Sequence, residues 1–193
     1  MEQKEVLDIF RKAGAILEGH FILTSGRHSA LYMQKAKVFM HAHYTEILCC
    51  ALAEKIKNNL QEKIDYLVGP AIGGLIPAYE TSRHFGTPAI WVEREKGLFR
   101  LRRFDINKGD KVVIIEDIVT TGLSVRETVK AMQEVGAEVV AAACIIDRSG
   151  GTVDVGVPLI SLCTYQVPSY AAEEVPEWLA QIPAIKPGSR NIS

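Results

Sequence analysis

The sequence predicts an α/β protein in which a mainly parallel sheet is covered by helices on both faces. Short apolar segments alternate with segments of helical spacing along most of the 193 residues, as expected for strand–helix–strand units. The strongest apolar segment, residues 112–115, consists of β-branched residues only, which suits a strand buried on both faces. The length fits a single domain, residues 1–193, with a core of ordinary size.

The first part of the chain predicts one helix and a short excursion before the sheet. Residues 1–14 are amphipathic, with apolar residues on one side, and predict a helix. Two short strands are expected at residues 21–23 and 30–33, joined by a turn-rich segment. A second helix is predicted over residues 44–60, where apolar residues recur at three- and four-residue steps.

The strands of the main sheet follow from residue 66 onward. In chain order, we expect strand 66–68, helix 75–85, strand 89–92, strand 111–116, a helix ending at Val135 and strand 139–146. Ligands of such sheets bind at the carboxyl ends of the parallel strands. We therefore expect the loops that begin at Gly69, Glu116 and Asp147 to lie at one edge of the sheet.

Composition and charge exclude several classes of protein. The net charge of −1 gives no overall field that would attract nucleic acid or an anionic membrane. Charged residues within residues 1–14 exclude a signal-peptide core, and the longest uncharged run, residues 155–172, contains prolines and polar residues that do not suit a membrane span. The four cysteines form no CxxC pair, which is typical of reduced thiols. A cytoplasmic location is therefore expected.

The most informative segment is residues 114–124, where an apolar strand runs into two carboxylates and then a loop of hydroxyl residues and glycine. The helix start that follows favours a phosphate, and Gly122 allows the backbone to approach it closely. Two carboxylates would repel this phosphate unless they hold other groups of the same molecule, such as sugar hydroxyls or hydrated Mg²⁺. A ribose 5-phosphate whose 2- and 3-hydroxyls face Glu116 and Asp117 meets both conditions.

A plain strand–turn–helix is the structural alternative for this segment. Residues 124–127, Ser-Val-Arg-Glu, have the pattern of a capping box that would begin the helix. A cap does not explain paired acids at a strand end, however, so we favour the ligand site. The common phosphate motifs GxxxxGK[ST] and GxGxxG do not occur in the sequence.

Residues 114–124 resemble the signature with which type I phosphoribosyltransferases bind phosphoribosyl pyrophosphate (PRPP). Residues 19–29, 69–74 and 146–151 resemble, more narrowly, the orotate phosphoribosyltransferases, and the segments follow that family's order along nearly the whole chain. The resemblance implies the type I phosphoribosyltransferase fold. Its parts are a central, mainly parallel sheet flanked by helices, a small hood from the N-terminal segment and a basic mobile loop.

The resemblance also implies a reaction, in which PRPP transfers its phosphoribosyl group to orotate. The products are orotidine 5′-phosphate and pyrophosphate, in pyrimidine (UMP) biosynthesis. Mg²⁺ would be the cofactor, carried by the pyrophosphate of PRPP rather than by a protein metal site. The protein would be a homodimer without nucleic-acid or membrane partners.

Two alternatives stay open at this point. One is a phosphoribosyltransferase for another base, such as a purine. The other is a nonenzymatic regulator that senses PRPP, which would need a nucleic-acid-binding extension or a basic face. We expect neither a nucleic-acid-binding extension nor a basic face in this chain, because only a short segment precedes the matched region and the net charge is slightly negative.

Site residues follow from the resemblance, position by position. Glu116 and Asp117 would hold the ribose hydroxyls, while Thr120 and Arg148 match positions that contact orotate. A guanidinium suits an acidic ring rich in carbonyl groups. The residues that would surround the 5-phosphate are Asp117, Ile118, Val119, Thr120, Thr121, Gly122, Leu123 and Ser124. The residues that would receive the pyrophosphate through backbone N–H groups are Ala71, Ile72, Gly73 and Gly74.

The chain departs from the family at two positions. Many members have lysine where this chain has Thr24 and Gly73, so two positive charges are missing or replaced. Lys35 and Lys37 are candidates to replace them, although surface lysines would show the same pattern.

Residues 94–103 contain five basic residues and one acid. A solvated hairpin is the structural alternative, but the positive surplus in a slightly acidic chain favours an anion site. The resemblance implies a mobile loop that closes over pyrophosphate and reaches into the neighbouring subunit's site. Arg94 matches its first basic position and is expected, with Lys96, to act in catalysis, whereas Glu95 stands where many members have lysine. The candidates for the loop's further cations are Lys96, Arg100, Arg102 and Arg103.

Overall fold

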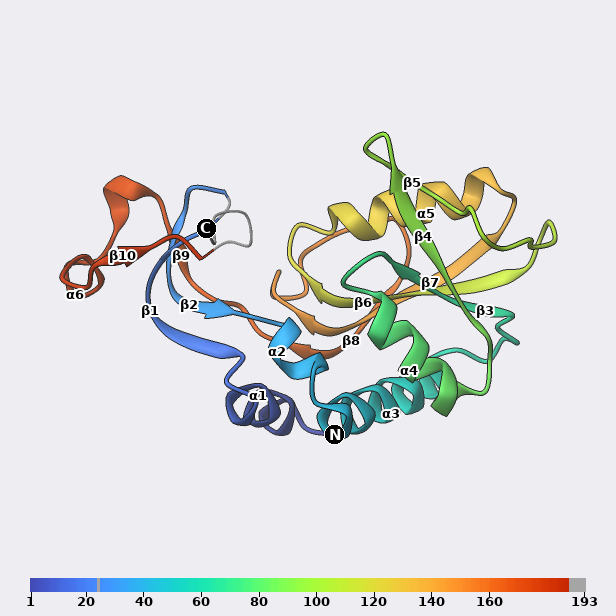
Figure 1. The fold of residues 1–193 in the computed structure, drawn as a ribbon, viewed down its shortest axis with the longest axis horizontal. Helices are drawn as coiled ribbons and strands as arrows, with labels where there is room; N and C mark the ends of the chain where they lie inside the picture. Colours follow the sequence, from blue (N-terminus) through green and yellow to red (C-terminus); the bar gives the residue numbers. More distant parts are fainter. Residues whose placement is uncertain (24, 188–193) are drawn as a thin grey trace.

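A computed structural model describes residues 1–23 and 25–187 of the chain, which form two sheets standing beside one another (Figure 1). The larger sheet has six strands, all parallel except the edge strand β5, which pairs antiparallel with β4. Its strands, from one edge to the other, are β5 (Leu98–Arg100), β4 (Ala89–Glu95), β3 (Tyr66–Pro70), β6 (Lys111–Val119), β7 (Glu138–Asp147) and β8 (Leu159–Thr164).

Helices cover both faces of this sheet, as the alternation of strands and helices predicted (Figure 1). The helices on one face are α1 (Gln3–Lys12), α3 (Ala42–Asn59) and α4 (Leu75–Phe85), and the opposite face carries α5 (Leu123–Glu134). Side chains of β6 alternate between the two layers: Val113 and Ile115 join the core under α3, and Val112 and Ile114 join the core under α5. Each such buried side chain stabilises the fold by about 1.5–3 kcal/mol.

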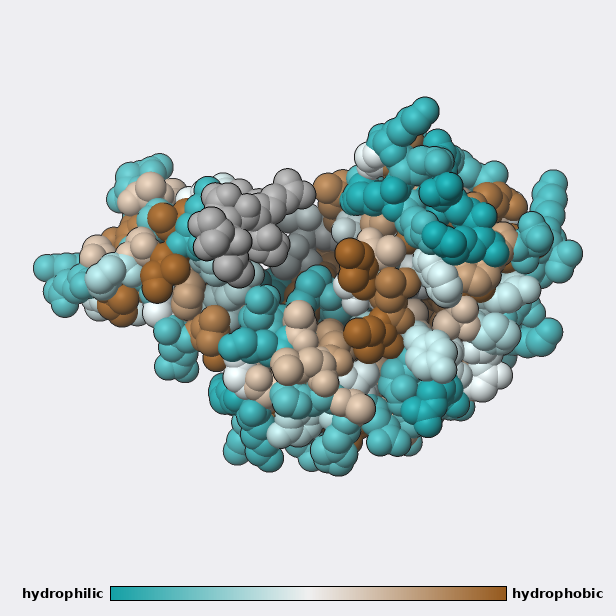
Figure 2. Space-filling model, viewed as in Figure 1, coloured by the Kyte–Doolittle hydropathy of each residue, from teal (hydrophilic) through white to brown (hydrophobic). Residues whose placement is uncertain are grey.

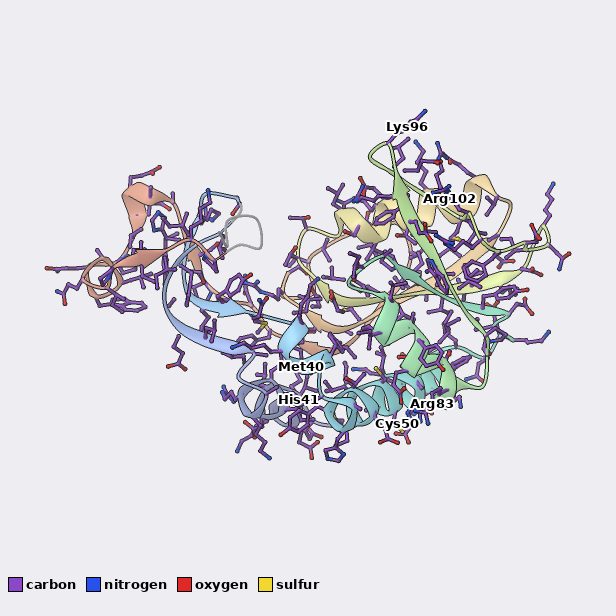
Figure 3. All side chains as sticks on the ribbon, in the orientation of Figure 1. Met40, His41, Cys50, Arg83, Lys96 and Arg102 are labelled. Atoms are coloured by element: carbon purple, nitrogen blue, oxygen red, sulfur yellow. The ribbon has the colours of Figure 1, made fainter. Side chains whose placement is uncertain are left out.

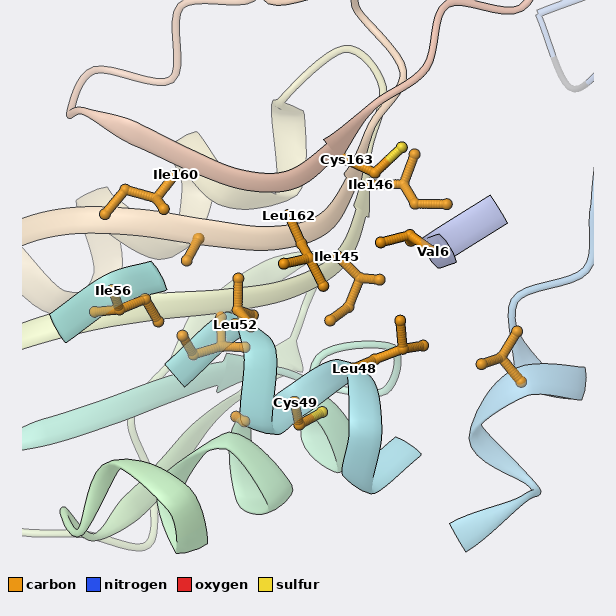
Figure 4. Packing of buried hydrophobic residues seen from close by; sticks show 14 of the residues in the cluster. Val6, Leu48, Cys49, Leu52, Ile56, Ile145, Ile146, Ile160, Leu162 and Cys163 are labelled. Carbon is orange, nitrogen blue, oxygen red and sulfur yellow. The ribbon is translucent and has the colours of Figure 1, made fainter. Parts of the chain in front are cut away.

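The core under α3 is the larger of the two apolar clusters. Figure 4 shows Leu48 and Leu52 of α3 lying against Ile145 of β7 and Leu162 of β8. All four side chains are at most 3% exposed. This packing holds β7 and β8 rigidly, and β7 ends in one of the loops of the site. Within the described part of the chain, no helix has both the length and the apolar character needed to cross a membrane.

The smaller sheet is the hood, and the N-terminal segment alone does not form it. β1 (Ile16–Ile22) and β2 (His28–Met33) make an antiparallel pair, and two-residue strands from near the other end of the chain complete it on both sides. These are β9 (Ser169–Tyr170), beside β2, and β10 (Ala184–Ile185), beside β1. The prediction is corrected here, for a physical reason: an isolated pair of strands leaves two unpaired edges. The short helices of the chain are α2 (Ala36–Phe39), η1 (Ala172–Glu174) and α6 (Glu177–Ala180).

Two further boundaries differ from the sequence predictions. β6 continues to Val119, so the acid pair lies within the strand rather than at its last residue, Glu116, as predicted, because β7 keeps pairing as far as Val119↔Asp147. β1 begins at Ile16, well before the predicted strand at residues 21–23. β8 was not predicted at all and lies within the uncharged run of residues 155–172.

Candidate active site

The acid pair lies near the carboxyl end of β6, the strand between β3 and β7. Glu116 is 7% exposed and Asp117 is 1% exposed. The Asp117 N–H donates a hydrogen bond to Glu116 Oε1 at 3.0 Å. Burial, and next the charge of Asp117, raise the pKa of Glu116 to about 8. At neutral pH this pair therefore presents one protonated carboxyl group beside Asp117, so it can both donate and accept hydrogen bonds.

The loop after β6 encloses a cavity of about 200 Å³ at the start of α5. Gly122 is the N-cap residue of α5, and its φ of +72° lies in the left-handed region. A Cβ there would lie 2.7 Å from Val155 Cγ1 and 2.8 Å from Val153 Cγ2, so only glycine fits. The cavity is lined by Glu116, Ile118, Val119, Thr120, Thr121, Gly122, Leu123, Ser124 and Val125.

The capping box considered as an alternative at residues 124–127 does not form. Ser124 lies inside α5, after the N-cap residue, and the N-cap residue itself, Gly122, has no side chain that could cap the helix. Instead, Glu127 forms an ion pair with Arg94 at 2.5 Å. The turn is made by the left-handed glycine, and the first N–H groups of α5 stay free to bind a phosphate.

The loop of residues 71–74 joins β3 to α4 and reaches the acid pair. Gly73 approaches so closely that a Cβ at this position would lie 2.5 Å from Asp117 Oδ2 and 3.1 Å from Lys35 Nζ. Lys35, at the N-terminus of α2, donates to Asp117 Oδ1 at 2.7 Å. Of the two lysines considered for the missing charges, Lys35 thus belongs to the site. The other departing position, Thr24, lies outside the described residues.

Arg148 follows β7 at the same edge of the sheet. Its backbone N–H donates to Val119 O at 2.8 Å, which places it beside Thr120, the other residue expected to contact orotate. Burial lowers the pKa of the Arg148 guanidinium, although the nearby phenols of Tyr165 and Tyr32 oppose this. Among the described residues, its buried Nε has no hydrogen-bond partner. A buried donor without a partner is costly, so the position suits an anionic ligand.

Asp147 organises this loop, although the sequence patterns above did not predict it as a site residue. It is 2% exposed, and its carboxylate accepts hydrogen bonds from the backbone N–H groups of Ser149 at 2.8 Å and Gly151 at 2.9 Å. An aspartate at a strand end, with Ser-Gly-Gly beginning two residues later, is typical of such a turn. That pattern was the available signal for its role.

The basic segment forms a hairpin between β4 and β5. Lys96 and Gly97 make a two-residue turn with φ values of +50° and +85°, and Lys96 projects from its tip (Figure 3). Arg94 lies over the Phe99 ring at 4.2 Å and pairs with Glu127. The other ion pairs of this hairpin are Arg100 with Glu134, Arg102 with Glu95 and Arg103 with Glu93.

The described residues that line the cavities beside the acid pair include none from this hairpin. Its arginines instead face carboxylates of α5 and of the hairpin itself. The structure therefore brings together the acid pair, the loops after β3 and β6, and Arg148. Arg94 and Lys96 line neither of these cavities.

An exposed apolar patch lies next to the site. It is defined by Met40, Ile72, Ile76 and Tyr79, which are 72%, 84%, 50% and 65% exposed. Figure 2 shows apolar side chains gathered on the face that carries α2 and α4. Three of the four residues also line a cavity of about 420 Å³ that extends to Lys35 and Asp117.

The mainly parallel sheet carries an acid pair near the end of one strand, and the loop after that strand forms a small cavity at the start of a helix. Together these features define a type I phosphoribosyltransferase. Residues 41–178 match the family model of the phosphoribosyl transferase domain. Curated orotate phosphoribosyltransferases from Bartonella henselae and Brucella canis are 71% and 67% identical over 192 residues, which is 100% of both chains in each case. The chain belongs to the orotate phosphoribosyltransferase family.

Solved structures agree with this fold. The orotate phosphoribosyltransferase from Aeropyrum pernix is 27% identical, with a TM-score of 0.72 over 82% of this chain and 93% of that one. The Mycobacterium tuberculosis enzyme, solved with inorganic phosphate, is 23% identical, with a TM-score of 0.67 over 84% and 95% of the two chains. An adenine phosphoribosyltransferase is 16% identical with a TM-score of 0.65 over 81% and 98%. The last two likenesses show the shared fold alone.

Proposed function

We propose that this chain transfers the 5-phosphoribosyl group of PRPP to orotate, in pyrimidine nucleotide biosynthesis. The observation that carries the proposal is the buried acid pair next to the cavity at the start of α5. That arrangement suits a sugar phosphate whose hydroxyls and phosphate are held by different groups. The names of the curated relatives supply the base, orotate.

Each part of the site takes one part of the substrates in this proposal. Asp117 accepts hydrogen bonds from the ribose hydroxyls, and Glu116, which holds a proton at neutral pH, donates one as well. Residues 118–124 enclose the 5-phosphate. In the loop of residues 71–74, the N–H groups of Ala71 and Gly74 already donate to Val92 O and Pro70 O, so the N–H groups of Ile72 and Gly73 would receive the pyrophosphate. Arg148, with its unpartnered Nε, binds the negative edge of orotate beside Thr120.

Catalysis then rests on positioning and on charge. The bond from ribose C1 to pyrophosphate breaks with its electron pair going to pyrophosphate, orotate N1 bonds to C1, and the N1 proton passes to the released pyrophosphate. Positive charge develops on the ribose and negative charge on the leaving group. Groups held in place before the reaction stabilise both charges without rearranging. Arg94 and Lys96 are the cations proposed to close over the pyrophosphate, which would also exclude water.

Mg²⁺ belongs to the proposal as a cation bound mainly by the substrate. The pyrophosphate of PRPP offers the hard oxygen ligands that Mg²⁺ prefers. The described residues contain no group of three or more side chains arranged to hold a metal ion, so pyrophosphate oxygens and water would complete its coordination. When bound, it neutralises charge on the leaving pyrophosphate.

The working form in this proposal is a homodimer. The apolar patch of Met40, Ile72, Ile76 and Tyr79 is large enough to favour contact with a partner, and cyclic dimers are the commonest oligomers. The hairpin tip projects from its own subunit (Figure 3) and would supply Arg94 and Lys96 to the partner's site. We also propose a cytoplasmic location, because all four cysteines are free thiols.

The test is an assay of pyrophosphate release from PRPP and Mg²⁺ with a panel of bases that includes orotate, uracil and adenine. We expect release with orotate only. Asp117→Asn should lose most of this activity and keep the fold, as judged by circular dichroism and the melting temperature. Release with adenine instead of orotate would overturn the choice of base. Unchanged turnover of Asp117→Asn at saturating PRPP would overturn the site.

A further inference from the structure

Lys35 is a cation that the hood side of the fold supplies to the acid pair. It lies 82 residues before Asp117, yet its Nζ donates to Asp117 Oδ1 at 2.7 Å. The carboxylate is 1% exposed, whereas the lysine side chain is 44% exposed. The ammonium group therefore sits between a buried anion and solvent, from which a ligand would approach. Its charge also lowers the pKa of Glu116, against the larger effects of burial and Asp117.

Gly73 makes this placement possible. A Cβ at position 73 would lie 3.1 Å from Lys35 Nζ and 2.5 Å from Asp117 Oδ2. A longer side chain at position 73 and the Lys35 ammonium would thus compete for the same space. The cation beside the loop of residues 71–74 comes from Lys35, next to α2, because position 73 is a glycine and carries no side chain.

The same ammonium group also stands in the way of the proposed substrate. Asp117 Oδ1 accepts hydrogen bonds from both Lys35 Nζ and the Ile118 N–H, so both of its lone pairs are used and a ribose hydroxyl can bind this oxygen only if Lys35 leaves. Both line one cavity of about 420 Å³ together with Ile72 and Gly73 of the loop proposed to receive pyrophosphate. A released ammonium group would therefore need only a side-chain rotation to meet an anion bound at this loop.

We propose that Lys35 is a substrate-binding residue that exchanges partners: it neutralises Asp117 in the free enzyme and moves to the pyrophosphate group when a ribose hydroxyl takes its place. This inference rests on the proposed function and adds a residue to it. The exchange keeps the buried carboxylate paired in both states, which matters because an unpaired buried charge is costly. A ligand with a pyrophosphate group gains an ion pair with the Lys35 ammonium group. A ligand without one has to displace this ammonium group from Asp117 and gains no ion pair in return.

The exchange predicts opposite effects on two ligands. Lys35→Met removes the charge and keeps most of the side-chain length. We expect PRPP and Mg²⁺-pyrophosphate to bind at least tenfold more weakly to this variant. Ribose 5-phosphate, which has no pyrophosphate group, should bind as well as to the wild type or more tightly. Lys35→Arg should recover a large part of the pyrophosphate binding.

Isothermal titration of the wild type and the variants with these three ligands would test the exchange. Lys37→Met is the matched control, since Lys37 is an exposed lysine of the same short helix, and it should bind all three ligands like the wild type. An equal loss of ribose 5-phosphate and pyrophosphate binding in Lys35→Met would overturn the inference, and so would unchanged binding of both. A wild-type protein that binds neither PRPP nor orotate would instead overturn the proposed function.

Discussion

Burial turns Glu116 into a weak acid, and the stability of the protein should depend on pH for this reason. Its pKa lies at about 8 in the folded chain, against an ordinary value of 4.5. The folded state thus binds this proton more tightly than the unfolded state does. The stabilising contribution is complete below the ordinary pKa and is lost as the pH rises through about 8.

Glu116→Gln should remove this pH dependence. We expect the melting temperature of the ligand-free wild type to fall more steeply between pH 6 and pH 9 than that of the variant. Above pH 8 the variant should be the more stable protein, by a few degrees. Glu54→Gln changes an exposed carboxylate and should follow the wild-type curve. Parallel curves for the wild type and Glu116→Gln, measured by calorimetry, would contradict the raised pKa.

Arg148 allows a prediction about the choice of base. Arg148→Ala should raise the KM for orotate roughly tenfold or more, because a charge-assisted hydrogen bond contributes about 1.5–3 kcal/mol. The KM for PRPP should stay nearly unchanged. The melting temperature should not fall, because the variant removes a buried Nε that has no partner among the described residues. Steady-state kinetics showing weaker PRPP binding with orotate binding intact would mean that Arg148 serves the other substrate.

The sequence predicted single site residues best where a reactive or charged side chain stands at a recognisable place, such as the end of a strand. Glu116, Asp117 and Arg148 follow from a strand end, a phosphate loop and a family resemblance, and the structure brings them to one edge of the sheet. The choice between Lys35 and Lys37 was not predictable. It depends on a contact across 82 residues and on the space left by Gly73, neither of which local patterns contain.

Among the elements, the loop between β6 and α5 is the most tightly constrained. Gly122→Ala should abolish detectable binding of ribose 5-phosphate and lower the melting temperature, because a Cβ would be 2.7 Å from Val155 and the φ is +72°. Gly86→Ala is the matched control: its φ is +85°, but nothing lies within 4 Å of the added carbon. It should lose some stability and keep ligand binding. Equal binding by both variants would show that this loop does not hold the phosphate.

The basic hairpin is held by contacts that can be released. All four of its arginines pair with carboxylates, and each of these arginine side chains is partly exposed. Exposed ion pairs contribute only about 0–1 kcal/mol each. The hairpin can therefore exchange these partners for a bound anion at little cost, which agrees with the proposed closing movement.

The elements that the sequence did not predict have a common physical cause. The long apolar strands were predicted because burial on two faces leaves a continuous pattern. β9 and β10 have two residues each and carry no pattern of their own, since they exist only through pairing with β2 and β1. The capping box at residues 124–127 failed because the left-handed Gly122 begins the helix earlier.

For the whole molecule, the dimer proposal can be tested by mixing two inactive variants. One is Asp117→Asn, and the other changes the basic residues of the hairpin to alanine: Arg94, Lys96, Arg100, Arg102 and Arg103. Each mixed dimer has one site with intact acids and an intact partner hairpin. Since random exchange of equal amounts makes half of the dimers mixed, about a quarter of the wild-type activity should return. Proven subunit exchange without recovery would mean that the hairpin serves its own subunit.

The hood also has a consequence for how the chain is made. The six-stranded sheet uses residues 66–164 only, so it can form while synthesis continues. β1 and β2, by contrast, must wait for residues 169–185 before their outer edges are covered. At about 5–20 residues per second, that delay is on the order of ten seconds. A ribosome that stalls before residue 169 would therefore hold a nearly complete catalytic sheet beside two uncovered strand edges, the part of the nascent chain that chaperones would have to protect.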